Sequence, residues 1–215
     1  MVSDNVLFGV RIIGMAFLTG NYLAQMIIGK DSPIFSLIYL TKFGYFLSWL
    51  YFVSVVQARI ITKVTLDRFV EALFEISFCF EAVITILYWV TLYEGGESPY
   101  DFYQNLAVHA VPLFLLFVDF IFNTYRFIAS RVILVLIFAW IYLLIFSLPY
   151  VLAVGPVYGQ FLTWKNAMSY VMIVGANVLI LIFFFSGRAI FTHCKLKKLE
   201  QIKKNPEREG EASDM

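Results

Sequence analysis

The hydrophobic positions of this chain form six long apolar stretches that are separated by short polar segments. A bilayer core about 30 Å thick is crossed by roughly 20 apolar helical residues. Each stretch reaches that length, so the pattern predicts an all-α bundle of six transmembrane helices within one membrane domain, residues 1–194. The predicted spans are about Val6–Ile28, Ile34–Gln57, Phe69–Tyr93, Tyr103–Asn123, Val132–Val154 and Ala167–Phe191.

Glycine and proline mark the ends of these spans. Breakers occur in Gly29–Pro33, Glu94–Pro99 and Gly155–Gly159, each of which joins two stretches. Two more prolines, Pro112 and Pro149, fall within predicted spans. A transmembrane helix tolerates proline when neighbouring groups satisfy the freed carbonyl. Both prolines are therefore predicted to mark kinks or helix ends.

Composition limits what lies outside the membrane. The chain is 61% hydrophobic and 14% charged, with a mean hydropathy of +0.81. This leaves little for a soluble domain beyond a polar tail over residues 195–215, whose first half is basic and whose remainder is predicted to be disordered. The basic half either anchors the last span or attracts anionic lipid. Without a basic segment before it, the first span is expected to be retained rather than cleaved. Cys79 and Cys194 are expected not to pair.

The distribution of Lys and Arg predicts the orientation. Cytoplasmic loops of membrane proteins carry an excess of basic residues. The loop Glu94–Asp101 has three acids and no base. Both termini are therefore predicted to be cytoplasmic. The membrane is predicted to be that of the endoplasmic reticulum, another endomembrane or the plasma membrane. That orientation leaves only Lys30 and Lys165 outside, and it places eleven basic residues inside: Arg59, Lys63, Arg68, Arg126, Arg131, Lys195, Lys197, Lys198, Lys203, Lys204 and Arg208.

Polar groups inside apolar spans are candidates for function, because they are costly there. Glu71 and Glu75 share a helix face, so each needs a cation or a proton. Arg11 is the predicted intramembrane partner, with Arg68 and Arg126 as interfacial ones. This predicts an ion-pair clamp between spans one, three and four; the alternative is a proton or cation path. The cytoplasmic layer of such groups consists of Arg11, Glu71, Glu75 and Asp119, with Glu81, protonated or facing a polar cavity, nearer the bilayer middle.

A second polar layer lies toward the opposite side. Thr41 lies about eight residues into span two, roughly 12 Å, and His109 about seven residues into span four, roughly 10 Å. The two spans run in the same direction, so these residues fall at matching depth, and Asn105 shares the face of His109. The layer consists of Asn21, Gln25, Thr41, Lys42, Asn105 and His109, with Tyr158 in the adjoining loop.

This layer permits hydrolytic chemistry. An imidazole can take the proton of a hydroxyl and make it nucleophilic, and an amide or cation such as Asn105 or Lys42 can stabilise an oxyanion. Spacing alone leaves non-catalytic alternatives open. Thr41 could instead hydrogen-bond to its own helix, and His109 could be a packing or substrate contact. No sequence motif indicates a metal, a nucleotide or an organic cofactor.

Four segments, in order, resemble a known family. They are Gly20-Asn21-Tyr22, Leu40-Thr41-Lys42-Phe43, Asn105-Leu-Ala-Val-His109 and Gly155-Pro-Val-Tyr-Gly-Gln-Phe-Leu162. They are similar to motifs of the androgen-induced family of multi-pass membrane threonine hydrolases, which cleave fatty acid esters of hydroxy fatty acids. Leu106 replaces the first histidine of the family's Asn-His-Gly-x-His motif, Ala107 replaces its glycine, and Gly159 replaces a later proline.

The resemblance implies a lipid esterase. Thr41 would be the nucleophile and His109 the base, while Asn105, Lys42 or Tyr158 would stabilise the oxyanion and Asn21 would bind substrate. A lipid ester would reach the site from the bilayer, without metal, organic cofactor or nucleic acid. The alternative, motivated by the acidic residues, is a non-enzymatic small transporter or an accessory subunit of a membrane complex.

Overall fold

The computed structural model describes residues 4–29, 37–61, 64–93, 95, 98–156, 158 and 162–196. These residues are helical or in turns and loops, with no strand among them, which confirms the all-α class. The elements are α1 (Asp4–Gly29), α3 (Leu40–Ile61), α4 (Val64–Leu87), η1 (Tyr88–Leu92), α5 (Pro99–His109), α6 (Val111–Phe122), η2 (Ala129–Arg131), α7 (Val132–Ile141), η3 (Tyr142–Ser147), α8 (Leu148–Ala153), α9 (Ala167–Ile190) and η5 (Phe191–Leu196).

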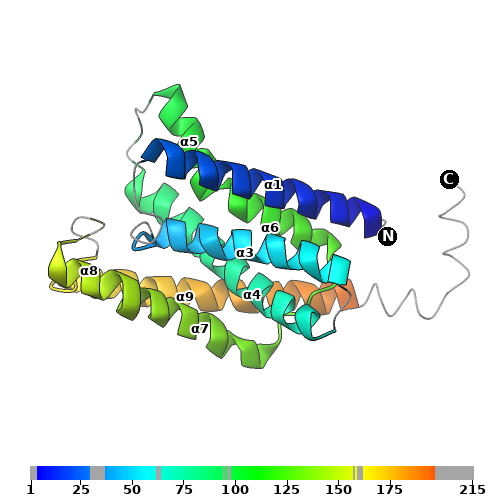
Figure 1. Cartoon of the computed structure of the whole chain (residues 1–215). Helices are drawn as coiled ribbons and strands as arrows, with labels where there is room; N and C mark the ends of the chain where they lie inside the picture. Colours follow the sequence, from blue (N-terminus) through cyan, green and yellow to red (C-terminus); the bar gives the residue numbers. More distant parts are fainter. Residues whose placement is uncertain are drawn as a thin grey trace, which may run out of the picture.

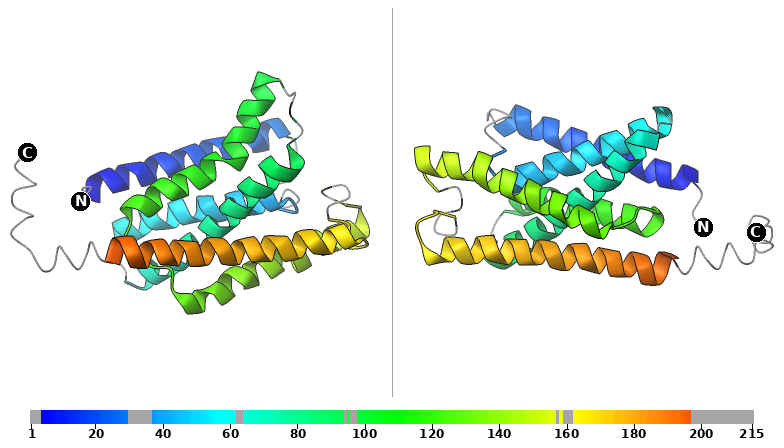
Figure 2. Two further views of the ribbon diagram at one scale, coloured as in Figure 1. Left: turned by 180° about the vertical axis from the view of Figure 1, so that it is seen from behind. Right: turned by 90° about the horizontal axis from the view of Figure 1, so that it is seen from below.

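Successive long segments run back and forth along one bundle (Figure 1). The start of α1 and the end of α9 lie at the same end of the bundle, in agreement between the views of Figures 1 and 2. Helix α4 packs against α3, α6, α7 and α9 and forms the centre of the molecule. Helix α5 projects past α1 at the opposite end from the termini (Figure 1).

Membrane-length apolar helices are present, although not all six predicted spans have the length and composition needed to cross a bilayer. Four described helices have the length and composition to cross a bilayer: Asp4–Ala24, Leu40–Ile61, Ala129–Ala153 and Ala167–His193. A fifth is counted if the bent pair α5 and α6 forms one span. Helix α4 is not among them, and it carries Glu71, Glu75 and Glu81 among its apolar residues. The structure thus supports a membrane protein, and the number six stays a prediction.

Both prolines within the predicted spans lie at helix junctions. Pro112 is the second residue of α6, and α5 and α6 meet at Ala110 with a bend of 40°. Pro149 is the second residue of α8 and follows the π-helical segment η3. Proline has no N–H to donate to the preceding turn, so it is tolerated at these starts. The prediction of kinks or helix ends is confirmed.

The buried charges pair differently from the sequence-based prediction. Arg11 of α1 donates through Nε to Asp119 of α6 at 2.7 Å, not to Glu71 or Glu75. Those two glutamates of α4 accept from Arg131, at 3.2 Å each. The predicted ion pair between spans one and four is present, since Arg11 contacts Asp119. The prediction that Arg11 would pair with Glu71 and Glu75 was wrong. Arg131 follows a loop, and its position there depends on tertiary packing.

Two further groups complete the interior. Glu81 is fully buried in α4 and accepts through Oε1 from Ser48 of α3 at 3.0 Å. Cys79 is a free, buried thiol. The predicted tail beyond Leu196 and the loop residues 30–36 lie outside the described residues, as does the side chain of Gln25.

Candidate functional site

Thr41 and His109 lie together at the end of the bundle that is remote from the termini. Thr41 is the second residue of α3, and His109 is the last residue of α5. The Thr41 Oγ1 and His109 Nδ1 atoms are 3.4 Å apart, with the donor set by the imidazole tautomer. Nucleophile and base are often more loosely placed without substrate than in the reacting complex. The predicted proximity of the two residues is therefore found, although α3 begins only at Leu40, so Thr41 lies in its first turn and not about 12 Å along a helix.

The His109 ring is held by the end of α4 and the π-helical segment η1. It stacks on the ring of Tyr88, with centroids 3.5 Å apart and planes 4° apart. The backbone carbonyl of His109, at the break between α5 and α6, accepts from Thr85 Oγ1 at 2.6 Å. Single π-helical turns occur often at functional sites. Here the π segment brings Tyr88 against the imidazole.

Tyr158 caps the beginning of α3. Its hydroxyl accepts from the backbone N–H of Leu40 at 2.6 Å. Burial raises the pKa of the Tyr158 phenol to about 12, and hydrogen bonds with Leu40, Tyr142 and Thr41 act in the opposite direction. The phenol is therefore protonated at neutral pH and remains a hydrogen-bond donor. It lies at the helix N-terminus, where partial positive charge favours an anion.

A polar cavity opens on one side of Thr41. It has a volume of about 410 Å³ and contains the predicted residues Lys42, Asn105, His109 and Tyr158. Its lining also includes Gln104, one residue before Asn105 on α5. The cavity therefore offers a cation, two amides and an imidazole around a space large enough for part of a substrate.

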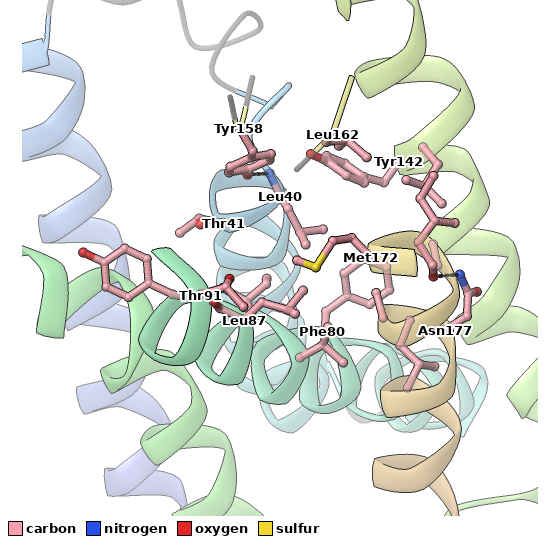
Figure 3. A pocket seen from close by; sticks show the side chains of 18 of the residues that line it. Leu40, Thr41, Phe80, Leu87, Thr91, Tyr142, Tyr158, Leu162, Met172 and Asn177 are labelled. Carbon is pink, nitrogen blue, oxygen red and sulfur yellow. Dashed lines mark hydrogen bonds between the residues drawn. The ribbon is translucent and has the colours of Figure 1, made fainter. Parts of the chain in front are cut away.

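An apolar pocket lies on the other side of Thr41. It has a volume of about 100 Å³ and runs between α3, α4, α7 with η3, and α9. Figure 3 shows Thr41, Leu40 and Tyr158 near one end, Phe80 toward the other, and the Met172 side chain extending between them. Thr41 and Tyr158 line both this pocket and the polar cavity. The candidate nucleophile thus stands between a polar and an apolar chamber.

Most of the predicted site residues are brought together. Thr41, Lys42, Asn105, His109 and Tyr158 line one cavity. Asn21 does not: it lies in α1 beside Tyr45, and it lines neither the polar cavity nor the apolar pocket. Its predicted role in substrate binding stays a prediction.

Two residues that hold His109, Tyr88 and Thr85, were not predicted from the sequence. Their only sequence signal is position, because both lie near the end of the third span at the depth of His109. Among the described residues, no group of three or more His, Cys, Asp or Glu side chains could hold a metal ion.

Comparisons of the chain with protein-family models, curated proteins and solved structures found no match. The resemblance to the threonine hydrolase family therefore rests on the four short motifs, and family membership stays a prediction.

Proposed function

We propose that this protein is a membrane-embedded hydrolase that cleaves a lipid ester with Thr41 as nucleophile and His109 as base. The observation that carries the proposal is the 3.4 Å approach of Thr41 Oγ1 to His109 Nδ1 at the junction of a polar and an apolar chamber. A nucleophile within reach of a base that is itself held in place is the general signature of covalent catalysis. The four family-like motifs support the same assignment.

In the first step His109 Nδ1 takes the proton of the Thr41 hydroxyl as Oγ1 attacks the ester carbonyl. The carbonyl oxygen becomes an oxyanion, which the Tyr158 phenol and the adjoining start of α3 stabilise. His109 then gives its proton to the leaving alkoxide. The ester bond breaks, an alcohol departs, and the acyl group remains on Thr41.

In the second step a water molecule from the polar cavity replaces the alcohol. His109 takes one proton from this water, whose oxygen attacks the acyl-threonine carbonyl. The tetrahedral intermediate collapses, the proton returns to Thr41 Oγ1, and a carboxylic acid is released. Lys42 and Asn105 lie on the side of the polar cavity, so they contact the alcohol half rather than the acyl half.

The proposal also includes six membrane spans with both termini cytoplasmic, in an endomembrane or the plasma membrane. Helix α4 carries charges, but Glu75 and Glu81 lie within its buried residues Leu73 to Ile84, so these two carboxyl groups are shielded from lipid. The arrangement of α1 and α9, whose outer ends share one end of the bundle, supports an even number of crossings (Figure 2). The site then opens toward the lumenal or extracellular leaflet.

The alternative of a transporter or accessory subunit draws less support from the acidic residues than the sequence suggested. Asp119 is paired with Arg11, and Glu71 and Glu75 are paired with Arg131. These contacts join α1 to α6 and the segment before α7 to α4, which is a structural role. Glu81 remains, with one carboxyl oxygen bonded to Ser48.

The decisive experiment is labelling and turnover of the purified protein in lipid nanodiscs. A fluorophosphonate probe is expected to form an adduct on Thr41, and Thr41→Ala and His109→Ala are each expected to lower kcat by at least about 10³-fold. Removing both should cost little more than removing one, because the two residues act as a unit. Peptide mapping of the adduct and ester hydrolysis are the measurements.

Thr192→Ala is the matched control, since Thr192 is an exposed threonine near the far end of α9 that donates to its own helix. It is expected to label and turn over as wild type does. Normal turnover by Thr41→Ala, or an adduct on another residue, would overturn the hydrolase proposal and favour a non-enzymatic protein.

A further inference from the structure

We propose that the apolar pocket selects the acyl half of the substrate, and that it takes one unbranched acyl chain of about eight to ten carbons. The inference rests on the proposed function, because it places the ester carbonyl that Thr41 attacks at the opening of this pocket. It concerns which half of the ester enters the bundle and how long that half is.

The wall of the pocket presents almost no hydrogen-bonding capacity to its interior. Apart from Thr41, Tyr88 and Tyr158, its polar side chains donate to backbone carbonyls of the protein: Thr91 to Leu87 at 2.5 Å, Tyr142 to Ile38 at 2.8 Å, and Asn177 to Ile173 at 2.8 Å. The remaining lining is largely aliphatic or aromatic. A polar ligand would lose its hydration there without replacement, so the pocket favours a hydrocarbon.

The length of the pocket follows from the helices that line it. Inward from Tyr88, which stacks on His109, its wall on α4 and η1 extends to Phe80, and its wall on α9 extends from Met172 to Ile180. Thr91 and Leu92 of η1 continue the lining outward from Tyr88. At 1.5 Å of rise per residue each wall is about 12 Å long, which matches an extended acyl chain of about eight to ten carbons.

The far end of the pocket is closed by packed side chains. Phe80, Ala139 and Ile180 are 2%, 6% and 4% exposed, so an acyl chain that enters at Thr41 meets a wall there. The small volume, about 100 Å³, excludes a second chain, and the Met172 side chain must turn aside before a chain of about eight to ten carbons fits. A longer or branched acyl group would have to displace these side chains, which costs stability in a well-packed interior.

The two chambers differ in size, and this assigns the two halves of the ester. Thr41 and Tyr158 line both chambers, so the ester carbonyl lies at their junction. The polar chamber, about 410 Å³, takes the alcohol half, which is the larger or more polar of the two. The side chain of Met172 extends along the pocket (Figure 3), and its flexible thioether can turn aside as the chain enters.

Chain-length selectivity in nanodiscs tests the inference. Wild-type protein is expected to hydrolyse the p-nitrophenyl esters of octanoate and decanoate at least about tenfold faster, by kcat/KM, than those of butanoate and hexadecanoate. Ala139→Phe fills the closed end and is expected to move the preference toward butanoate. Ile180→Ala opens that end and is expected to move it toward hexadecanoate.

Ile182→Ala is the matched control, because Ile182 lies on the same helix but is 51% exposed on its outer side. Its profile is expected to match that of wild type. A flat profile in wild type, or equal shifts in Ile180→Ala and Ile182→Ala, would overturn the inference while leaving the hydrolase proposal intact.

A binding measurement separates the two proposals. The Thr41→Ala protein retains the pocket but cannot form an acyl-enzyme, so methyl octanoate is expected to raise its melting temperature more than methyl hexadecanoate does. The Ile180→Ala change in that background should reverse the order. If this order is found while the wild-type protein cleaves no ester, the pocket inference stands and the hydrolase proposal fails. If neither ester changes the melting temperature, the pocket inference fails.

Discussion

At the scale of single residues, the site depends on how an imidazole is held in a largely apolar surrounding. His109 stacks face to face on Tyr88 and is fixed through its own carbonyl by Thr85. The stacking fixes the plane of the imidazole ring. The hydrogen bond from Thr85 to the His109 carbonyl fixes the end of α5 relative to α4. Because a base must keep its nitrogen within hydrogen-bonding reach of the nucleophile, these neighbours act as positioning residues for Thr41 and His109.

The Tyr158 hydroxyl gives a test of oxyanion stabilisation at this scale. Tyr158→Phe removes one donor and keeps the ring, so it is expected to lower kcat by about 10²–10³-fold with little change in KM. Steady-state hydrolysis of an octanoyl ester measures both constants. Tyr170→Phe removes the hydroxyl of an exposed tyrosine that donates to Trp164 and is expected to behave as wild type. Equal losses in the two variants would exclude a specific role for Tyr158.

At the scale of helices, α3 and α4 form the tightest pair in the bundle. Their approach depends on Gly44, where a methyl group would collide with Ile84 and would lie 3.3 Å from Glu81 Oε1. Small residues let transmembrane helices approach closely. The pair therefore carries Thr41 at the start of one helix and Tyr88 at the end of the other in a fixed relation.

Gly44→Ala tests this packing. The added methyl is expected to destabilise the protein by about 1–3 kcal/mol, because it forces the Ile84 side chain out of its position between the two helices. Thermal unfolding in nanodiscs measures the effect. Gly20→Ala is the matched control: Gly20 is exposed in α1, and nothing lies within 4 Å of an added methyl. That control is expected to be neutral or slightly stabilising, since alanine favours helix; equal losses would contradict the close-packing account.

The ion pair between α1 and α6 gives a second test among the helices. Asp119 is fully buried and accepts from Arg11 at 2.7 Å, from Tyr51 at 2.5 Å and from Asn123 at 2.7 Å. Arg11→Ala leaves a buried carboxylate without its cation and is expected to cost about 3–5 kcal/mol. Adding Asp119→Asn should recover part of that loss, whereas adding Glu71→Gln should not. Thermal unfolding of the four proteins decides between these partners.

At the scale of the whole molecule, orientation in the bilayer decides which leaflet supplies the substrate. A glycosylation acceptor inserted in the loop between Glu94 and Ser98 is expected to be modified, and one in the tail after Leu196 is expected to remain unmodified. A mobility shift that glycosidase reverses, measured in microsomes, reports each site. Modification of the tail acceptor would contradict the proposed orientation and would place the Thr41–His109 site on the cytoplasmic side.

Much of the architecture could be predicted from the sequence, because hydrophobic length and breakers act locally. The approximate positions of the helices follow from hydrophobic length and a rise of 1.5 Å per residue. The depth estimate for Thr41 was wrong, because α3 begins at Leu40 and Thr41 is its second residue, whereas His109 is the last residue of α5. The partners of buried charges could not be predicted in this way. Glu71 and Glu75 pair with Arg131, which follows a loop whose path depends on tertiary packing.

The apolar pocket could not be predicted from the sequence either. It is lined by residues of α3, α4, α7, α9 and the neighbouring segments. Apart from Thr41 and Tyr158, the sequence gives no reason to distinguish these residues from others in a membrane helix. Which of them face a cavity rather than lipid depends on the rotation of each helix in the bundle. The π-helical segment η1 changes that rotation locally, and no simple period in the sequence reveals it.

The position of Thr41 between two chambers has a consequence for the order of events in turnover. Under the proposed chemistry the alcohol leaves through the polar chamber, while the acyl group stays behind on the threonine in the apolar one. Water must then arrive through the space that the alcohol has just vacated, so the two compete for the same acyl-enzyme. Such an enzyme releases its products in a fixed sequence, and a high concentration of alcohol turns it from hydrolysis toward exchange of one ester for another.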